Sequence, residues 1–294
     1  MRFTVAFLLS LFVLCSVSMG QVVPNTAVRD WESLDRELSK VSGTLVENRP
    51  FGKTETFFAF NGKLSKFEST TESKRGESKE VILANGKYAF RLKENRAGEF
   101  LLAEVAAPGE ALWLQGVRSN IRACNSVLGF SILEALTTPD FEFTDWVCNP
   151  TGICTFKIRC IASEETKNRN EYLDSVLVEV DANAKHRVIR RIESRTVPVK
   201  QTVERRYEYG DGILPTRVVV DIKFDGANTI TQESLYSEVS KEVPPSSEFE
   251  LTHYGLPNYA AASEPWSAAF TIFIGAIVVG LLAIAISVFG RRRA

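Results

Sequence analysis

Hydrophobic positions near the start of the chain recur at helical spacing. They fall three and four residues apart, which places them on one face of a helix, at Val28, Trp31, Leu34, Leu38 and Val41. Thr26 stands just before this run, where a capping side chain can accept hydrogen bonds from the first free N–H groups. The pattern predicts one amphipathic helix over residues 26–41.

After Gly43 the hydrophobic period changes from helical to strand-like. Apolar side chains alternate with polar ones, as in strands that have one face in water, at Phe57, Ala59, Tyr88, Phe90 and Leu92. Asn-Gly or Asp-Gly pairs separate the runs at 61–62, 85–86, 211–212 and 225–226, and such pairs tolerate the positive φ of tight hairpins. Consecutive antiparallel strands are therefore predicted.

Two stretches interrupt the alternation. Residues 120–136 carry Ile121, Ile132 and Leu136 at helical spacing before Pro139, which predicts a short helical interruption. Residues 238–247 contain two prolines followed by two serines and predict an extended connector before a last strand at 249–251. No fixed-period repeat is present, which argues against solenoids and propellers.

The N-terminus has the three parts of a secretory signal peptide. Arg2 precedes an apolar run over residues 3–17, and Ser18 and Gly20 supply small residues for cleavage before Gln21. A buried core segment is the alternative. Cys15 raises a lipoprotein alternative, which the bulky Leu14 in front of it disfavours. The prediction is a signal peptide over residues 1–20 and an extracytoplasmic domain over 21–254.

The C-terminus carries the other long apolar run. Residues 266–289 contain no charge over 24 positions, which at ~1.5 Å per residue gives roughly 36 Å of helix, enough to cross a ~30 Å hydrocarbon core. Arg291, Arg292 and Arg293 follow, as expected on the cytoplasmic side. The sequence predicts a linker over 255–265, one transmembrane helix over 266–290 and a basic cytoplasmic tail over 291–294. The protein would be a single-pass protein of the inner membrane with its large domain in the periplasm.

The same tail supports a second interpretation. A short polar stretch ending in Glu264-Pro265, an apolar span and a terminal arginine cluster resemble the three-part signals read by exosortase-type enzymes, which remove the helix. Ser263 occupies the position where such signals have a proline. The length of the uncharged span is by itself enough to explain a transmembrane helix that is kept. A retained membrane anchor is therefore the prediction, and removal of the helix is the alternative.

Composition narrows the class of the central domain. The whole chain is 45% hydrophobic and 10% aromatic, values typical of a packed core. Of its net charge of −1, Arg2 and the three terminal arginines lie outside the domain, which therefore carries −5. A mildly acidic domain with scattered basic residues argues against nucleic-acid binding.

Two sequence stretches resemble a known family. Residues 86–92 (GKYAFRL) and 214–221 (LPTRVVVD), with the order helix, antiparallel strands, helical insertion and strands, resemble the half-barrel of lipoprotein-carrier (LolA-like) proteins. The ending at 249–257 (FELTHYGLP) is similar to uncharacterised exported proteins of planctomycete-type bacteria. The resemblance implies an α+β domain with a large curved, half-barrel-like antiparallel sheet and a few helices, and a concave apolar face that holds acyl chains.

Cysteine is the most informative residue type of the exported domain. After signal removal Cys124, Cys148, Cys154 and Cys160 remain, an even number in an oxidising compartment. Residues 149–152 form a predicted hairpin loop with Cys148 and Cys154 at its neck, which would leave Cys124 for Cys160, although four cysteines allow three pairings. Free buried thiols are the alternative. The spacing fits neither a zinc site nor a redox motif, so no metal or other cofactor is predicted.

Catalysis is not predicted for this domain. Only His186 and His253 exist, and no nucleophile or phosphate-binding motif accompanies them. His186 lies in a predicted turn, where exposure to solvent is the simplest expectation. Asp140, Glu142 and Asp145 are close in sequence, but acidic residues at strand edges are usually solvated. An unrecognised hydrolase stays an alternative.

Basic residues of a predicted strand pair form a candidate anion-binding patch. Arg187, Arg190 and Arg191 alternate with apolar residues, and Arg205 follows on the predicted neighbouring strand. The patch would suit lipid head groups or envelope polymers. The alternative is a strand face whose charges are balanced by Glu193, Glu204 and Glu208.

The sequence thus predicts a ligand-binding or protein-interaction domain. A module for a lipid or another amphipathic molecule predicts a concave sheet lined by Phe57, Phe90 and Leu92. A structural subunit of an envelope complex predicts an exposed apolar patch that meets an envelope protein. An enzyme predicts a pocket that gathers a histidine or several carboxylates.

Overall fold

The structure is a computed structural model that describes residues 23–257 except 75, 128–129, 140, 162–174, 196–199 and 227, and except the side chains of residues 130, 160 and 195. The predicted signal peptide, the predicted transmembrane helix, the predicted basic tail, most of the linker and Asp140 lie outside the described residues. Within residues 23–257, as far as they are described, no helix is long and apolar enough to cross a membrane.

The described residues form three α-helices, two β-sheets and three 3-10 helices. In chain order they are α2 (Asn25–Leu38), β1 (Lys40–Arg49), β2 (Gly52–Asn61), β3 (Leu64–Ser73), β4 (Gly76–Ala84), β5 (Ala89–Glu94), β6 (Phe100–Ala106), α3 (Leu112–Ile121), β7 (Ser126–Val127), β8 (Phe130–Ser131), α4 (Ile132–Thr137), β9 (Phe141–Cys148), β10 (Ile153–Cys160), β11 (Ser175–Asp181), η1 (Ala182–Ala184), β12 (Arg187–Arg195), β13 (Gln201–Glu208), β14 (Arg217–Phe224), β15 (Ile230–Ser240), η2 (Ser246–Phe249) and η3 (Leu251–Tyr254).

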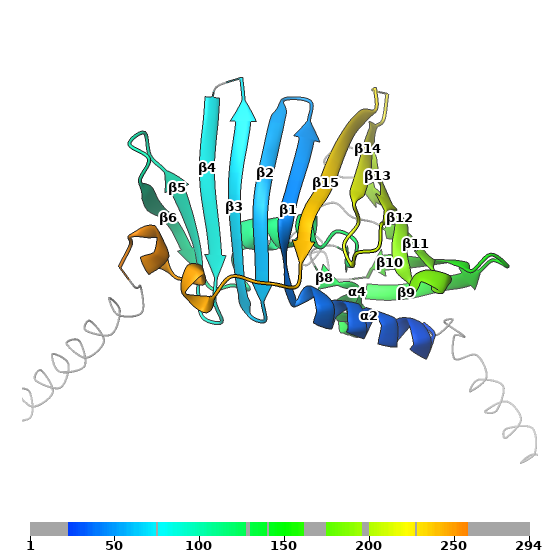
Figure 1. The fold of residues 1–294 in the computed structure, drawn as a ribbon. Helices are drawn as coiled ribbons and strands as arrows, with labels where there is room; N and C mark the ends of the chain where they lie inside the picture. The colour runs from blue at the N-terminus through cyan, green and yellow to red at the C-terminus, as the bar shows by residue number, and fades with distance from the viewer. Residues whose placement is uncertain are drawn as a thin grey trace, which may run out of the picture.

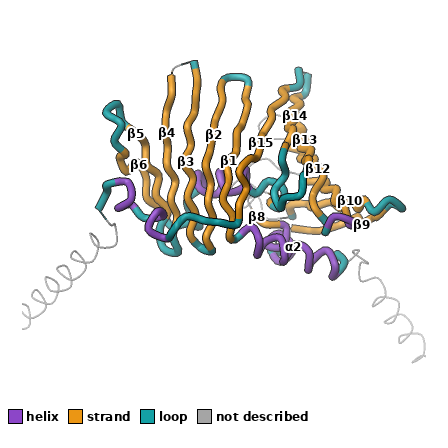
Figure 2. Tube along the Cα trace, viewed as in Figure 1, coloured by secondary structure: helices purple, strands orange, loops and turns teal. Residues whose placement is uncertain are grey.

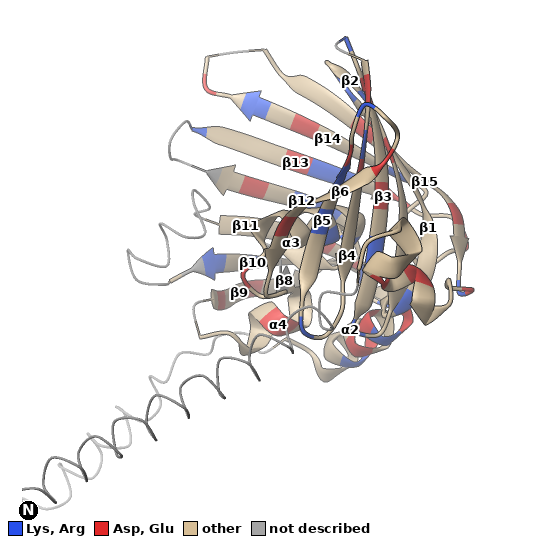
Figure 3. Ribbon diagram, turned by 90° about the vertical axis from the view of Figure 1, so that its left-hand side faces the viewer, with Lys and Arg blue, Asp and Glu red and all other residues tan. Residues whose placement is uncertain are grey.

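One antiparallel sheet dominates the described fold. Its thirteen strands have the order β6-β5-β4-β3-β2-β1-β15-β14-β13-β12-β11-β10-β9. Chain neighbours pair within β1–β6 and within β9–β15, and the pairing of β1 with β15 joins the two sets of six and seven strands. The sheet curves into an open half-barrel whose ends, β6 and β9, do not pair with each other (Figures 1 and 3). The predicted antiparallel sheet is confirmed, with Gly62 and Gly226 at positive φ in two of the predicted turns.

Helices fill one end of the concave side, as the tube in Figure 2 shows. Leu114 and Ile121 of α3 and Ile132 of α4 are buried in one core with the inward-facing side chains of the sheet. Helix α2 lies across the same end of the half-barrel (Figure 1). An open, strongly curved sheet has an apolar inner face, and these helices remove part of that face from water.

The register of the strands decides which hydrophobic residues face inward. Phe58 opposes Phe67, and Ile82 follows on β4; these residues belong to the inner core. Phe90 and Leu92 alternate with the inward positions and pack instead with Leu251 of η3 in a second cluster on the outer face. The prediction that Phe90 and Leu92 line the concave face is wrong. Phe57, next to inward-facing Phe58, also points outward, where Lys66 lies 5.7 Å from its ring.

The helical segments differ from their predicted limits. Helix α2 is confirmed but begins at Asn25, with Pro24 and not Thr26 before its first residue and no capping side chain. It ends at Leu38, so Val41 belongs to β1. The interruption predicted for 120–136 is two helices, of which α3 begins at Leu112. Residues 249–251 are not a strand: Phe249 ends η2 and Leu251 begins η3, and both side chains are buried. Leu251 belongs to the outer cluster. The polar, proline-containing stretch before these turns has no pattern of hydrophobic residues from which their packing against the sheet could be predicted.

Candidate functional site

The inner face retains an open groove where the helices end. Its cavity has a volume of about 210 Å³ and is floored by β14, which contributes Val218, Val220 and Ile222. These three side chains share a face at two-residue spacing and form an apolar column roughly 13 Å long at ~3.3 Å per residue. Val203 of β13 lies opposite Ile222 and extends the column sideways.

Polar residues surround this apolar floor. Glu47 and Arg49 of β1 and Gln232 of β15 line one side, and Arg205 of β13 lines the other. A groove with an apolar floor and a few polar groups at its margins suits a ligand that has both an apolar and a polar part. We call this set of residues the inner groove; they come from β1, β13, β14 and β15 and from the end of α3, all labelled in Figure 3.

The closed end of the inner groove is built from the end of α3. The hydroxyl of Tyr236 lies 3.1 Å from the carbonyl oxygen of Asn120 and 3.2 Å from that of Ile121, so its single proton is shared between the two acceptors. Tyr207 donates to the carbonyl of Ala123 at 3.0 Å. The last carbonyls of a helix have no partner within it, and these tyrosines tie the end of α3 and the segment that follows it to the inner face of the sheet.

A buried arginine completes this contact between the sheet and the segment after α3. Arg191 is only 4% exposed, and its Nη1 donates to the carbonyls of Ala123, at 3.2 Å, and of Ser126. Its Nη2 lies 3.0 Å from a carboxylate oxygen of Glu193, which also pairs with Arg205. A buried cation is tolerated because a carboxylate and carbonyl oxygens surround it.

The predicted arginine patch is divided between different surroundings. Arg191 and Arg205 lie on the inner face, whereas Arg190 points outward and pairs with Glu179 and Glu204 at 3.0 Å. Arg187 lies over the ring of Tyr209, with 5.2 Å from its guanidinium carbon to the ring centroid. The structure therefore does not bring the four arginines together on one surface. The alternative interpretation describes this region better, since Glu193 and Glu204 each pair with arginines of β12 and β13.

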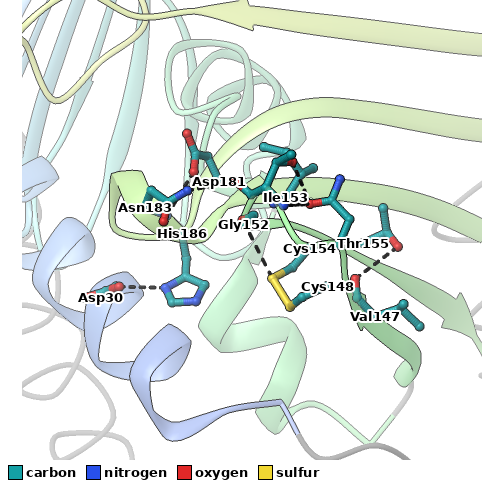
Figure 4. The surroundings of a disulfide bond; sticks show 12 residues. Asp30, Val147, Cys148, Gly152, Ile153, Cys154, Thr155, Asp181, Asn183 and His186 are labelled. Atoms are coloured by element: carbon teal, nitrogen blue, oxygen red, sulfur yellow. Dashed lines mark hydrogen bonds and ion pairs between the residues drawn. A yellow bond between two sulfur atoms is a disulfide. The ribbon is translucent and has the colours of Figure 1, made fainter.

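The cysteines divide into one disulfide and one free thiol among the described side chains. Cys148 and Cys154 form a disulfide across the β9–β10 hairpin, as the sequence predicts (Figure 4). Cys124 is a free, buried thiol, so it does not pair with Cys160, whose side chain is not described. Burial raises the pKa of the Cys124 thiol to about 12, which keeps it protonated and unreactive at neutral pH.

The disulfide closes a short loop, which limits its contribution to stability. In the chain-entropy description a loop of this length contributes roughly 2 kcal/mol. The double variant Cys148→Ser with Cys154→Ser should lower the free energy of unfolding by about that amount or less, as measured by urea denaturation under non-reducing conditions. A loss well above this would show that the disulfide also stabilises packing of the core beyond the loop that it closes.

His186 is buried and bound to α2, contrary to the expectation of a solvated turn residue. Its Nδ1 lies 2.7 Å from a carboxylate oxygen of Asp30 (Figure 4). Its backbone carbonyl accepts a hydrogen bond from Nε1 of Trp31 at 3.0 Å. The turn is packed against α2, and this contact between distant segments buries His186 although the local sequence is that of an exposed turn. No serine, threonine or cysteine side chain of the described residues donates a hydrogen bond to this imidazole, so the pair lacks the nucleophile of a hydrolytic triad. The absence of catalysis stays a prediction.

Metal ligands do not gather in the described part of the chain. Across those residues no three His, Cys, Asp or Glu side chains are grouped so that they could hold an ion.

Comparison with known proteins adds a likeness of fold. No protein-family model matches the chain, and no curated protein matches its sequence. Among solved structures, the fold is similar to a domain from Vibrio parahaemolyticus described as an outer membrane lipoprotein-sorting protein, with 8% identity, a TM-score of 0.43, and coverage of 78% of this chain and 96% of that one. It is also similar to a LolA-superfamily protein from Nitrosomonas europaea, with 12% identity, a TM-score of 0.36, and coverage of 74% and 96%.

Sequence reasoning missed the residues that form the inner groove. Val218, Val220 and Ile222 alternate with Val219, Asp221 and Lys223 and carried a detectable strand pattern. Nothing in that pattern shows that α3 covers the lower part of the inner face and leaves the upper part of β14 accessible. The signal for the site lies in the pairing of β14 with β13 and β15, which only the fold supplies.

Proposed function

We propose that this domain binds an amphipathic molecule, such as a lipid or the acylated end of a lipoprotein, in the inner groove. The observation that carries the proposal is the apolar column of Val218, Val220 and Ile222 beside Arg205 and Gln232. An acyl chain would lie along the column because contact there removes apolar surface of both partners from water. The polar part of the ligand would meet the margins of the groove.

The inner groove supports this proposal better than the outer face does. Across the described strands β11 to β14 the outer face is occupied by linked ion pairs, among them Arg190 with Glu179 and Arg206 with Asp221. Charged, paired side chains would have to lose water without gaining a partner if an acyl chain lay on them. An apolar ligand is therefore directed to the inner face. One use of such a site would be to carry lipoproteins between membranes. Another would be to bind the ligand while the predicted transmembrane helix keeps the domain at the membrane.

A matched pair of variants tests the site. Val220→Gln places an amide in the apolar column, whereas Val219→Gln places the same amide on the outer face of the same strand. With the purified full chain in mild detergent, titration with a fluorescent fatty acid should show saturable binding that Val220→Gln weakens about tenfold or more, since burying an unpaired amide costs ~1–3 kcal/mol. Val219→Gln should leave the dissociation constant within about twofold.

Two outcomes would count against this function. Equal affinities of the two variants would show that the fatty acid binds elsewhere, for example to the predicted transmembrane segment. Non-saturable uptake by the unaltered chain would indicate partition into detergent instead of a site.

A further inference from the structure

A second cavity lies apart from the inner groove, at the end of the half-barrel that α2 covers. Its volume is about 320 Å³, at the lower end of the range of small-molecule pockets. Five parts of the chain form its walls: one face of α2, the start of β1, the turn before β12 with Arg187, the loop between β13 and β14, and the end of β15. We call it the α2 cleft. The proposed function makes no use of it.

Two basic side chains on one wall of the α2 cleft are available to a ligand. Neither Lys185 nor Arg187 has a carboxylate within ion-pair distance among the described residues. Arg187 is held against the ring of Tyr209, which fixes its guanidinium group without neutralising it. Lys241, on another wall, pairs with Glu37 at 3.2 Å and is therefore already neutralised.

An acidic side chain faces the same cavity from the β13–β14 loop. Asp211 lines the cleft and forms no ion pair with any described residue, Arg187 included. Leu34, Ile213 and Val239 supply apolar surface between the charged walls. The cleft thus offers a cationic wall, a separate carboxylate and a small apolar floor.

The backbone that carries the basic wall is fixed in an unusual conformation. Lys185 and His186 have φ of 56° and 50°, a region that residues other than glycine rarely adopt. The bonds of His186 to Asp30 and Trp31 tie this turn to α2. Positive φ is common in the turns of β-hairpins, and the contacts with α2 fix this turn, and with it the basic wall, in one position.

From this arrangement we infer that the α2 cleft binds a small zwitterion, a molecule that carries a primary ammonium group and an oxyanion a few bonds apart. The oxyanion, a phosphate or a carboxylate, binds Arg187 and Lys185, and the ammonium group binds Asp211. A simple anion fits less well because the carboxylates of Asp30 and Asp211 line the same cavity and repel it. The zwitterion could be a free metabolite or the head group of a lipid.

Calorimetric titration of the full chain with phosphoethanolamine tests the inference. We expect saturable binding at least tenfold tighter than that of inorganic phosphate or of ethanolamine alone. Arg187→Gln and Asp211→Asn should each weaken it about tenfold or more, whereas Lys93→Gln, on an exposed position of β5, should leave it unchanged. Phosphate that binds as tightly as phosphoethanolamine would overturn the assignment, and so would the absence of any binding.

Two further arms separate the sources and the sites. Competition by water-soluble dihexanoyl phosphatidylethanolamine would identify a lipid head group, and its failure to compete would identify a free zwitterion. Val220→Gln should not alter phosphoethanolamine binding, because the inner groove is a different site. Asp211 lies on an exposed loop, so the circular dichroism spectrum of the Asp211→Asn variant should be unchanged. Loss of phosphoethanolamine binding by a variant with an intact fold then reports on the α2 cleft alone.

Discussion

Replacement of Trp31 by alanine should cause a large loss of stability. Trp31 is fully buried, contacts the rings of Trp146 and Phe156, and donates its Nε1 hydrogen to the carbonyl of His186. Truncation of a buried tryptophan costs ~3–5 kcal/mol. At roughly 2–4 °C per kcal/mol for a domain of this size, Tm should fall by about 6–20 °C in a calorimetric scan.

Two companion variants separate packing from hydrogen bonding. Trp31→Phe keeps an aromatic ring but leaves the His186 carbonyl without its donor, so it should lose only part of the stability, about 1–3 kcal/mol. Leu112→Ala removes a side chain that is 75% exposed and should change the free energy of unfolding by less than about 0.5 kcal/mol. An alanine variant of Trp31 as stable as the unaltered chain would mean that α2 is not packed on the sheet.

Removal of the Glu193 carboxylate should have the second large effect. Glu193 is 5% exposed and pairs with both Arg191 and Arg205. Glu193→Leu leaves the charge of Arg191 buried without its carboxylate, a loss that costs ~3–5 kcal/mol. Urea denaturation should show a correspondingly lower midpoint with an unchanged slope.

The outer face of the same strands provides the control for Glu193. Glu204 is 13% exposed, but its partners Arg190 and Arg206 are 38% and 45% exposed. Without Glu204 both guanidinium groups can be solvated by water, unlike the buried Arg191, so Glu204→Leu should cost less than Glu193→Leu. Equal losses in the two variants would show that Arg191 is not the buried centre of the contact with the segment after α3.

The sequence predicts the fold where one pattern dominates. Period-two alternation between Asn-Gly and Asp-Gly turns was enough to predict consecutive antiparallel strands, and the helical spacing of Trp31 and Leu38 was enough for α2. Cys148 and Cys154 were predictable because the loop between them is short and turn-like. Each of these signals is local.

What the sequence could not supply depends on contacts between distant segments. Phe90 and Leu92 have the alternation of an inner face, but η3 covers the outer face and gives these residues a second core. Arg190 and Arg191 are neighbours in sequence yet have opposite environments, because a strand directs consecutive side chains to opposite faces. The inner groove likewise exists only because α3 ends where Tyr207 and Tyr236 hold it.

Photo-crosslinking with a diazirine-labelled fatty acid, followed by peptide mapping of the full chain, tests the central claim most directly. If the inner groove binds the acyl chain, labels should concentrate on inward-facing residues of β13, β14 and β15, with Val220 and Ile222 foremost, and unlabelled fatty acid should compete. Labels confined to the apolar chain ends, or to outward-facing positions such as Val219 and Leu235, would contradict the account.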